Sequence, residues 1–197
     1  MNLSMPSKMG VLSKLLGSLL LLAGCGDIKR NPDGSTELNY FYPDGKLKKQ
    51  MTKRVGENGA TIEYWKFFSP DSMLVKEGEN RGDKSEGLWK FYYETGELKS
   101  ETFFIDGVRN GEAKYYWPSG QAQGAGTYKN GELDGLWTAW HDNGQMERQG
   151  RMLTGKEEGE WKTWNRDGGL KMTVIYKNGE QVETKIHVAE LDSTDLN

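Results

Sequence analysis

The segment Gly87-Leu88-Trp89-Lys90-Phe91-Tyr92-Tyr93-Glu94-Thr95-Gly96 decides the fold, because its pattern returns at a constant step of 24 residues. Its first glycine recurs at Gly111, Gly135 and Gly159, and its last at Gly120, Gly144 and Gly168. A third column of glycines follows the same step at Gly107, Gly131, Gly155 and Gly179. A period of this length is typical of stacked supersecondary units, none of which buries its apolar face alone.

Each unit contains two short strand patterns and two turns. The aromatic-rich first run suits a strand that ends at a glycine turn. The second run ends at Asp106-Gly107, and its equivalents end at Asn130-Gly131 and Asn178-Gly179. These dipeptides favour the positive φ angles of tight hairpin turns, and strands joined by such turns must pair antiparallel. The sequence therefore predicts an all-β fold, an elongated antiparallel β-meander of stacked hairpin repeats.

Aromatic residues form two columns across the units. One column lies four residues before the turn and comprises Phe41, Phe68, Tyr92, Tyr116, Trp140 and Trp164. The other comprises Trp65, Trp89, Trp137 and Trp161. Because side chains alternate faces along a strand, we expect the two columns on opposite faces of the sheet. The mid-strand glycines Gly124, Gly126 and Gly150 leave room for rings to lie over the backbone, and we expect this packing to form the core.

Trp89, Trp137 and Trp161 are also the sharpest candidates for a binding surface. Equivalent rings on a repeat sheet would lie about 10 Å apart, and an exposed row could stack sugar rings or an extended peptide. Packing within the sheet is the favoured interpretation, because the mid-strand glycines accept these rings. Binding is the alternative.

The N-terminal residues 1–24 have the pattern of a lipoprotein signal peptide. Lys8 and Lys14 precede an apolar run, which ends in Leu22-Ala23-Gly24-Cys25. This ending resembles the lipobox of bacterial lipoproteins, which implies cleavage between Gly24 and Cys25 and lipidation of Cys25. Cys25 is the only cysteine, so the chain has no internal disulfide. The alternative is an ordinary secretory signal with an incidental cysteine.

The remainder of the chain divides by composition. Residues 25–39 are expected to be the lipidated N-terminus and a spacer that ends in a turn. Residues 40–188 are expected to form the repeat domain, and its last alternating run is expected to be an edge strand with charged positions. Residues 189–197 are expected to be a flexible acidic tail. Since 35% of the 197 residues are apolar and 26 are glycine, the composition suits a thin array of hairpins.

Catalytic and metal-binding motifs are not evident in the sequence. The only histidines are His141 and His187. His141 is expected to be a solvent-facing turn residue, with a lone pH-sensitive contact as the alternative. The acidic residues at the turns are expected to be solvated charges, with binding or glycosidase chemistry as alternatives. These residues are Glu97, Glu132, Glu157, Glu158 and Glu180. The net charge is −3 and no basic cluster is present, so no nucleic-acid partner is expected. Because no cofactor- or metal-binding motif is found, no cofactor or metal is expected either.

The repeats resemble a known family. Residues 87–101 and the run from Gly135-Leu136-Trp137 to Asn143-Gly144-Gln145-Met146 look like the MORN repeat variant, and the resemblance covers about residues 40–182. Bacterial proteins with this repeat often carry the label of YwqK-type antitoxins of toxin–antitoxin systems. The resemblance implies antiparallel hairpins stacked into a long sheet that serves as a scaffold in membrane-proximal or protein-binding roles.

Together these features predict a non-catalytic binding scaffold that is anchored in the bacterial cell envelope through its N-terminal lipid. In a cell with two membranes, the expected location is the outer membrane facing the periplasm, because no aspartate directly follows Cys25. The expected partner is a protein or an envelope glycan. An envelope carbohydrate hydrolase and an antitoxin are the alternatives.

Overall fold

The computed structural model describes residues 26–56 and 59–187, and fifteen strands follow one another along this part of the chain. No helix occurs in the described residues, so the predicted all-β fold is confirmed. The strands are β1 Ile28–Arg30, β2 Thr36–Phe41, β3 Leu47–Val55, β4 Thr61–Phe68, β5 Leu74–Arg81, β6 Lys84–Tyr92, β7 Leu98–Ile105, β8 Val108–Tyr116, β9 Ala122–Lys129, β10 Glu132–Leu133, β11 Gly135–Trp140, β12 Met146–Leu153, β13 Lys156–Trp164, β14 Leu170–Lys177 and β15 Glu180–Ile186.

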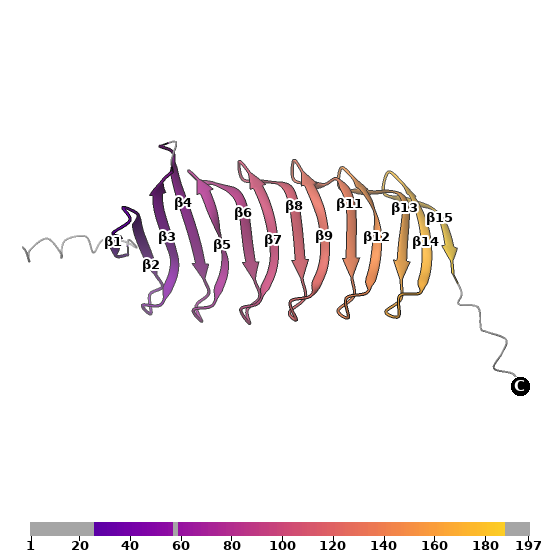
Figure 1. Cartoon of the computed structure of the whole chain (residues 1–197), viewed down its shortest axis with the longest axis horizontal. Helices are drawn as coiled ribbons and strands as arrows, with labels where there is room; N and C mark the ends of the chain where they lie inside the picture. The colour runs from indigo at the N-terminus through magenta and orange to yellow at the C-terminus, as the bar shows by residue number, and fades with distance from the viewer. Residues whose placement is uncertain (1–25, 57–58, 188–197) are drawn as a thin grey trace, which may run out of the picture.

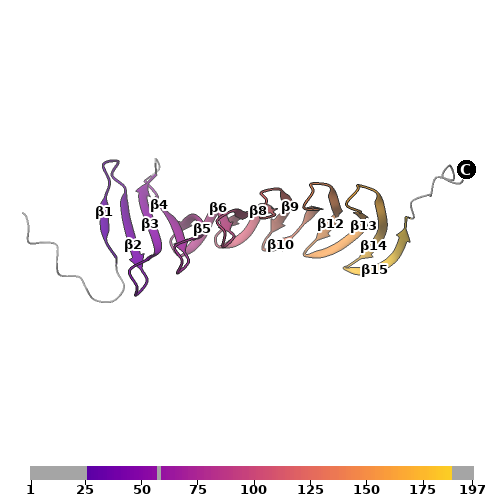
Figure 2. The same ribbon diagram turned by 90° about the horizontal axis from the view of Figure 1, so that it is seen from below.

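These strands form one antiparallel sheet in sequence order, with the two-residue β10 paired to β9 beside the main path. Figure 1 shows the resulting long ribbon, with hairpin turns along both of its sides and the edge strands β1 and β15 at its ends. The view in Figure 2 shows a single twisted layer. At a spacing of about 4.8 Å between strands, the sheet is roughly 60 Å long.

The turns between repeats adopt the backbone geometry that their sequences predict. Asp106-Gly107, Asn130-Gly131 and Asn178-Gly179 all have positive φ at both residues, for example 52° and 92° at Asn130-Gly131. The less regular unit has no glycine after Pro70-Asp71, and Ser72 adopts a φ of 65° in its place. The degenerate unit therefore preserves the turn although its sequence departs from the repeat.

The first glycine column has a structural role inside the strands. Gly87, Gly111, Gly135 and Gly159 have φ angles of 68°, 123°, 120° and 69°, values that other residues rarely adopt. Near two of them the pairing is interrupted opposite a mid-strand glycine, at Gly78 on β5 and at Gly150 on β12. Such irregularities bend the strand and increase its twist. The strict 24-residue repeat of this glycine thus reflects a backbone requirement.

The two aromatic columns lie on opposite faces, as predicted. We call one face the tryptophan face; it carries Trp65, Trp89, Trp137 and Trp161. We call the other face the tyrosine face; it carries Tyr92 and Tyr116, whose hydroxyls contact Glu77 and Glu101.

The N-terminal boundary of the sheet differs from the prediction. Residues 25–39 were expected to be a spacer ending in a turn, but Ile28–Arg30 and Thr36–Phe41 form the first hairpin. Its turn is held by Asp33, which accepts hydrogen bonds from the backbone N–H and the hydroxyl of Ser35. These contacts make a polar segment a stable turn, and its short strands add to the sheet edge. At the other end β15 is the edge strand that the alternating charges predicted. The predicted signal peptide 1–24, Cys25 and the predicted tail 189–197 lie outside the described residues.

Candidate functional site

The tryptophan face is organised by rings that lie over glycines. A Cβ atom placed on Gly150 would be 2.1 Å from Cδ2 of Trp161, and one placed on Gly78 would be 2.5 Å from Cδ2 of Trp89. Both indoles also donate hydrogen bonds from Nε1 to backbone carbonyls, Trp89 to Glu79 at 2.9 Å and Trp161 to Arg151 at 3.2 Å. The rings are therefore fixed in position by contact and by hydrogen bonding. The predicted ring-over-glycine core is confirmed.

This packing corrects the idea of an exposed tryptophan row. Trp89 and Trp161 are only 3% and 2% exposed, so neither presents a ring face to a ligand. Trp137 is half-buried over Gly124 and Gly126 and keeps an accessible part. The row is also interrupted, since Ala113 stands where the repeat has tryptophan in the units on either side. A continuous stacking platform is therefore not formed.

Cations lie over several other rings of this face. The Lys49 ammonium lies 4.4 Å from the Tyr40 ring centroid and 5.0 Å from that of Trp65. Lys76 lies in the same way over Phe67 and Trp89, at 4.7 and 5.4 Å. Near the other end of the sheet, Arg148 lies 4.3 Å from Trp161 and 2.7 Å from a carboxylate oxygen of Glu157. These contacts leave less of the π surface of these rings free for a sugar, whereas none of the three cations lies over Trp137.

A hydrogen-bonded column along one side of the sheet joins consecutive repeats. Tyr93 Oη donates to the Tyr116 carbonyl, Trp117 Nε1 to the Trp140 carbonyl, and His141 Nε2 lies 3.0 Å from the Trp164 carbonyl. A carbonyl only accepts, so His141 must carry its proton on Nε2 in this contact. His141 was expected to be solvent-facing, but it is half-buried and links two units. Tyrosine, tryptophan and histidine can all fill this position of the repeat, because each carries a hydrogen-bond donor on its ring.

On the tyrosine face, residues of opposite charge alternate along one row of the sheet. Direct cross-strand neighbours place Lys66, Glu77, Lys90, Glu101 and Lys114 in succession on β4 to β8. Lys66 lies 3.9 Å from Glu77, and Lys90 lies 3.6 Å from Glu101. Since every pair is of opposite charge, the row supports the register of five strands.

Tyrosine hydroxyls complete this row. Tyr92 donates to Glu77, and Tyr116 donates to Glu101 at 2.9 Å. Burial, and then the negative charge and hydrogen bonding of Glu77, raise the pKa of Tyr64 to about 12. Burial also raises the pKa of Tyr116, with its hydrogen bond to Glu101 as the next cause. The phenols therefore act as neutral donors to the carboxylates.

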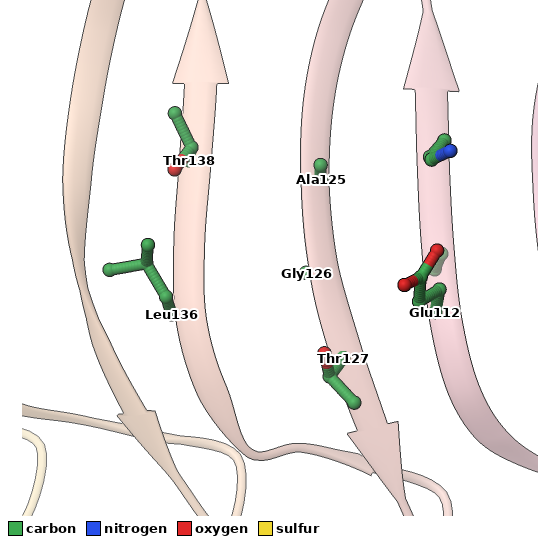
Figure 3. A pocket seen from close by; sticks show the side chains of 8 residues that line it. Glu112, Ala125, Gly126, Thr127, Leu136 and Thr138 are labelled. Atoms are coloured by element: carbon green, nitrogen blue, oxygen red, sulfur yellow. The ribbon is translucent and has the colours of Figure 1, made fainter.

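A hollow opens on the tyrosine face where the charged row ends. Beyond Lys114, the same row continues with Ala125 and Thr138, whose side chains are short. The hollow has a volume of about 380 Å³ and lies over β8, β9 and β11. Figure 3 shows Glu112 on one side and Leu136 and Thr138 on the other, with Ala125, Gly126 and Thr127 along the floor. We call this region the central hollow.

A smaller hollow of about 170 Å³ adjoins the central hollow and shares Glu112 and Lys114 with it. Leu88, Phe103 and Glu101 complete its lining. Leu88, Phe103 and Leu136 are 44%, 41% and 60% exposed, so the two hollows together display apolar side chains around a pair of opposite charges. Within residues 26–56 and 59–187, neither Glu112 nor Lys114 forms an ion pair.

Sequence reasoning missed this site. The sequence feature that could have indicated it is a pair of small residues, Ala125 and Thr127, where the preceding repeat has Glu101 and Phe103. They lie on a strand that also carries Gly124 and Gly126. Those glycines indicated space on the tryptophan face, but the alanine and threonine between and after them leave space on the other face. Cross-strand register was needed to place Glu112, Lys114 and Thr138 around that space.

The acidic residues named from the sequence lie elsewhere. Glu157 pairs with Arg148, and Glu158 accepts a hydrogen bond from the Asn178 backbone N–H. A hydrogen bond from the Thr95 side chain lowers the pKa of the Glu97 carboxyl. Glu132 and Glu180 are exposed near turns. None of the five lines either hollow.

Two further properties concern the described part of the chain. It contains no group of three or more His, Cys, Asp or Glu side chains arranged to hold a metal ion. It also contains no helix of the length and hydrophobicity that a membrane span requires. Gly24 and Cys25, the predicted cleavage and lipidation site, are outside it.

Comparison with known families supports the assignment of the repeats. The MORN repeat variant model matches residues 37–52, 85–106, 109–130, 133–152 and 157–178, which together make up more than half of the chain. No curated protein matches the sequence. The matched segments include hairpin partners along most of the sheet, from β2 to β14. The chain therefore belongs to the MORN repeat variant family.

Proposed function

We propose that this protein is a non-catalytic scaffold that binds a protein partner through the central hollow. The proposal rests on one observation: the hollow brings an exposed leucine, Leu136, together with Glu112 and Lys114, two opposite charges that have no ion-pair partner in the described residues. Everywhere else along this row, from Lys66 to Glu101, the charges satisfy one another. An unsatisfied pair beside apolar surface is suited to recognition.

A protein segment fits the central hollow better than a glycan does. Its lining contains no aromatic ring, and sugar binding by stacking needs one. Strand β8 pairs with β9 from Gly111 to Tyr116, and β9 pairs with β11 where Ala125 lies opposite Thr138 and Gly124 opposite Ala139, so recognition through side chains is favoured along this floor. Leu136 supplies an apolar contact surface, and Thr138 leaves room beside it. Glu112 and Lys114 would pair with opposite charges on the partner and so determine its orientation. A glycan remains the competing partner.

The cellular location is part of the same proposal. The run from Leu22 to Cys25 supports a lipid anchor in the bacterial cell envelope. A sheet tethered at its N-terminal end would present both faces close to the membrane surface.

A photo-cross-linking experiment in cells tests the binding site. We would place a benzophenone amino acid at Leu136 and, as the matched control, at Val55, which is 71% exposed and lies on β3 away from the hollow. We expect a discrete protein adduct at position 136 that is weakened by Glu112→Ala and Lys114→Ala and is insensitive to glycosidase treatment. Identical adducts at both positions would reject the site, and an adduct removed by glycosidase would favour the glycan.

An envelope carbohydrate hydrolase is the second candidate. It is favoured by the two carboxylates, Glu101 and Glu112, that line the smaller hollow. Glu101, however, is held by Lys90 and Tyr116, which favours a structural role. Release of reducing sugar from envelope glycans, lost on Glu112→Gln, would support the hydrolase; no release by the wild type would reject it.

A further inference from the structure

The edge strand β15 is unusually open. All seven of its residues are exposed, and Val182 and Ile186 are 59% and 70% exposed. Within the described residues, the sheet ends at this strand. An exposed strand edge of this length is a template for pairing with another strand.

The backbone direction along β15 follows from its contacts with β14. The His187 N–H donates to the Lys171 carbonyl, and the same register joins Thr173 to Lys185 and Ile175 to Glu183. In an antiparallel ladder, alternate residues point their N–H and C=O groups to opposite sides. His187, Lys185 and Glu183 therefore face β14, whereas Thr184 and Ile186 direct their backbone groups to the outer edge.

The side chains along this edge are self-complementary in one register. We propose that two copies of the chain pair antiparallel through β15, about a two-fold axis between their Thr184 residues. Each Glu183 then lies opposite Lys185 of the second copy. The regular pairing is confined to residues 183 to 185, because the register between β14 and β15 shifts at Val182. The two Thr184 residues form a hydrogen-bonded pair, because their N–H and C=O groups point outward.

The neighbouring registers are disfavoured by the same charges. A shift of the two-fold axis to residue 183 places Glu183 against Glu183, and a shift to residue 185 places Lys185 against Lys185. Parallel, in-register pairing of two β15 strands places Glu183 against Glu183 and also Lys185 against Lys185. Like charges directly opposite each other destabilise a pair of strands. From the sequence, we expected the charges of Glu183 and Lys185 to discourage pairing at this edge. In this arrangement they disfavour only the shifted registers, and they permit the register centred on Thr184.

The opposite end of the sheet is a poor partner for β15. The strand β1 has only three residues, Ile28–Arg30, so it offers few outward backbone groups. Pairing of β15 with itself is isologous and closes after two copies, whereas pairing with β1 would continue as a filament. In the closed dimer the tryptophan faces of both copies lie on the same side, because the two-fold axis is perpendicular to the sheet.

A charge exchange tests the register. For the full chain, sedimentation equilibrium at low salt should show a weak, concentration-dependent dimer, since a single edge strand buries little area. Glu183→Lys alone or Lys185→Glu alone creates like pairs and should raise the dissociation constant about tenfold or more. The double variant Glu183→Lys/Lys185→Glu restores opposite pairs and should return the constant to near the wild-type value. Glu180→Lys is the control, because it makes the same charge change outside the paired residues.

Amide hydrogen exchange supplies a second measurement. On raising the protein concentration, the Thr184 amide should become protected, while the Glu183 and Lys185 amides, already paired to β14, should change little. A wild type that is monomeric at every concentration would overturn the proposal. A dimer whose dissociation constant is unchanged in the charge variants would also overturn the proposal, and so would assembly beyond two copies.

Discussion

The substitution Gly150→Ala tests the ring-over-glycine packing most directly. The added Cβ would lie 2.1 Å from Cδ2 of Trp161 and 2.4 Å from its Cε2 and Cγ atoms, whereas carbon atoms in contact need about 3.5–4.0 Å. Trp161 has no free space to retreat into, because it is 2% exposed and bonded to the Arg151 carbonyl. The ring must therefore leave its site. We expect a loss of about 3–5 kcal/mol, the range for removing a buried tryptophan.

The same change should be harmless once the ring is gone. In a Trp161→Ala background, Gly150→Ala meets no ring and restricts the unfolded chain, so we expect it to be neutral or to stabilise by about 0.5–1 kcal/mol. The coupling between the two sites is then about 3 kcal/mol or more, well above the value for residues that do not touch.

Urea unfolding followed by circular dichroism measures the free energy of unfolding of the wild type, of the two single variants and of the double variant, which together form a double-mutant cycle. Because repeat arrays can unfold in segments, amide exchange on β12 and β13 should accompany it. Gly78 and Trp89 form a matched pair in which the Cβ atom would lie 2.5 Å from the ring, so the cycle should repeat there. Equal losses from Gly150→Ala with and without Trp161 would refute the packing argument.

Three further predictions follow from the structure. Trp137→Ala should destabilise the fold less than Trp161→Ala, by about 2–3 kcal/mol, because Trp137 is half-buried; urea midpoints compare the two, and a larger loss for Trp137 would contradict the burial. The raised pKa of Tyr64 keeps its phenol neutral in the fold while the unfolded phenol ionises, so its contribution to stability is complete below pH 10 and is lost as the pH rises through about 12; Tyr64→Phe should reduce this alkaline loss in urea titrations. Cys25→Ser should abolish incorporation of labelled fatty acid and release the protein from the membrane fraction, and unchanged fractionation would refute the lipid anchor.

Much of the fold could be predicted from local sequence. The φ preferences of Asn-Gly and Asp-Gly determine tight hairpins wherever they occur, and these turns allow only antiparallel neighbours. The 24-residue period makes each hairpin equivalent to the next, so the meander follows without knowledge of long-range contacts. The hairpin of residues 28–41 was missed because β1 has only three residues and no alternating apolar pattern.

The candidate site depended on contacts between strands. A two-residue shift in the pairing, as at Gly150, changes which residues lie opposite one another, and no pattern within a single strand reveals it. The same holds for the central hollow, since Glu112, Thr127 and Leu136 come from three strands. The packing of rings over mid-strand glycines was predicted, but Gly78, the glycine that Trp89 covers, was identified only by the contacts between strands.

By itself, then, the sequence determined an open antiparallel meander, its turns and the division of its aromatic residues between two faces. These features arise from the conformational preferences of a few neighbouring residues, repeated at a constant interval. Only the tertiary structure decided which rings are covered, where Lys114 is left without an ion pair and which backbone groups of β15 face outward. Those properties belong to residues that are distant in sequence and are brought together by cross-strand register.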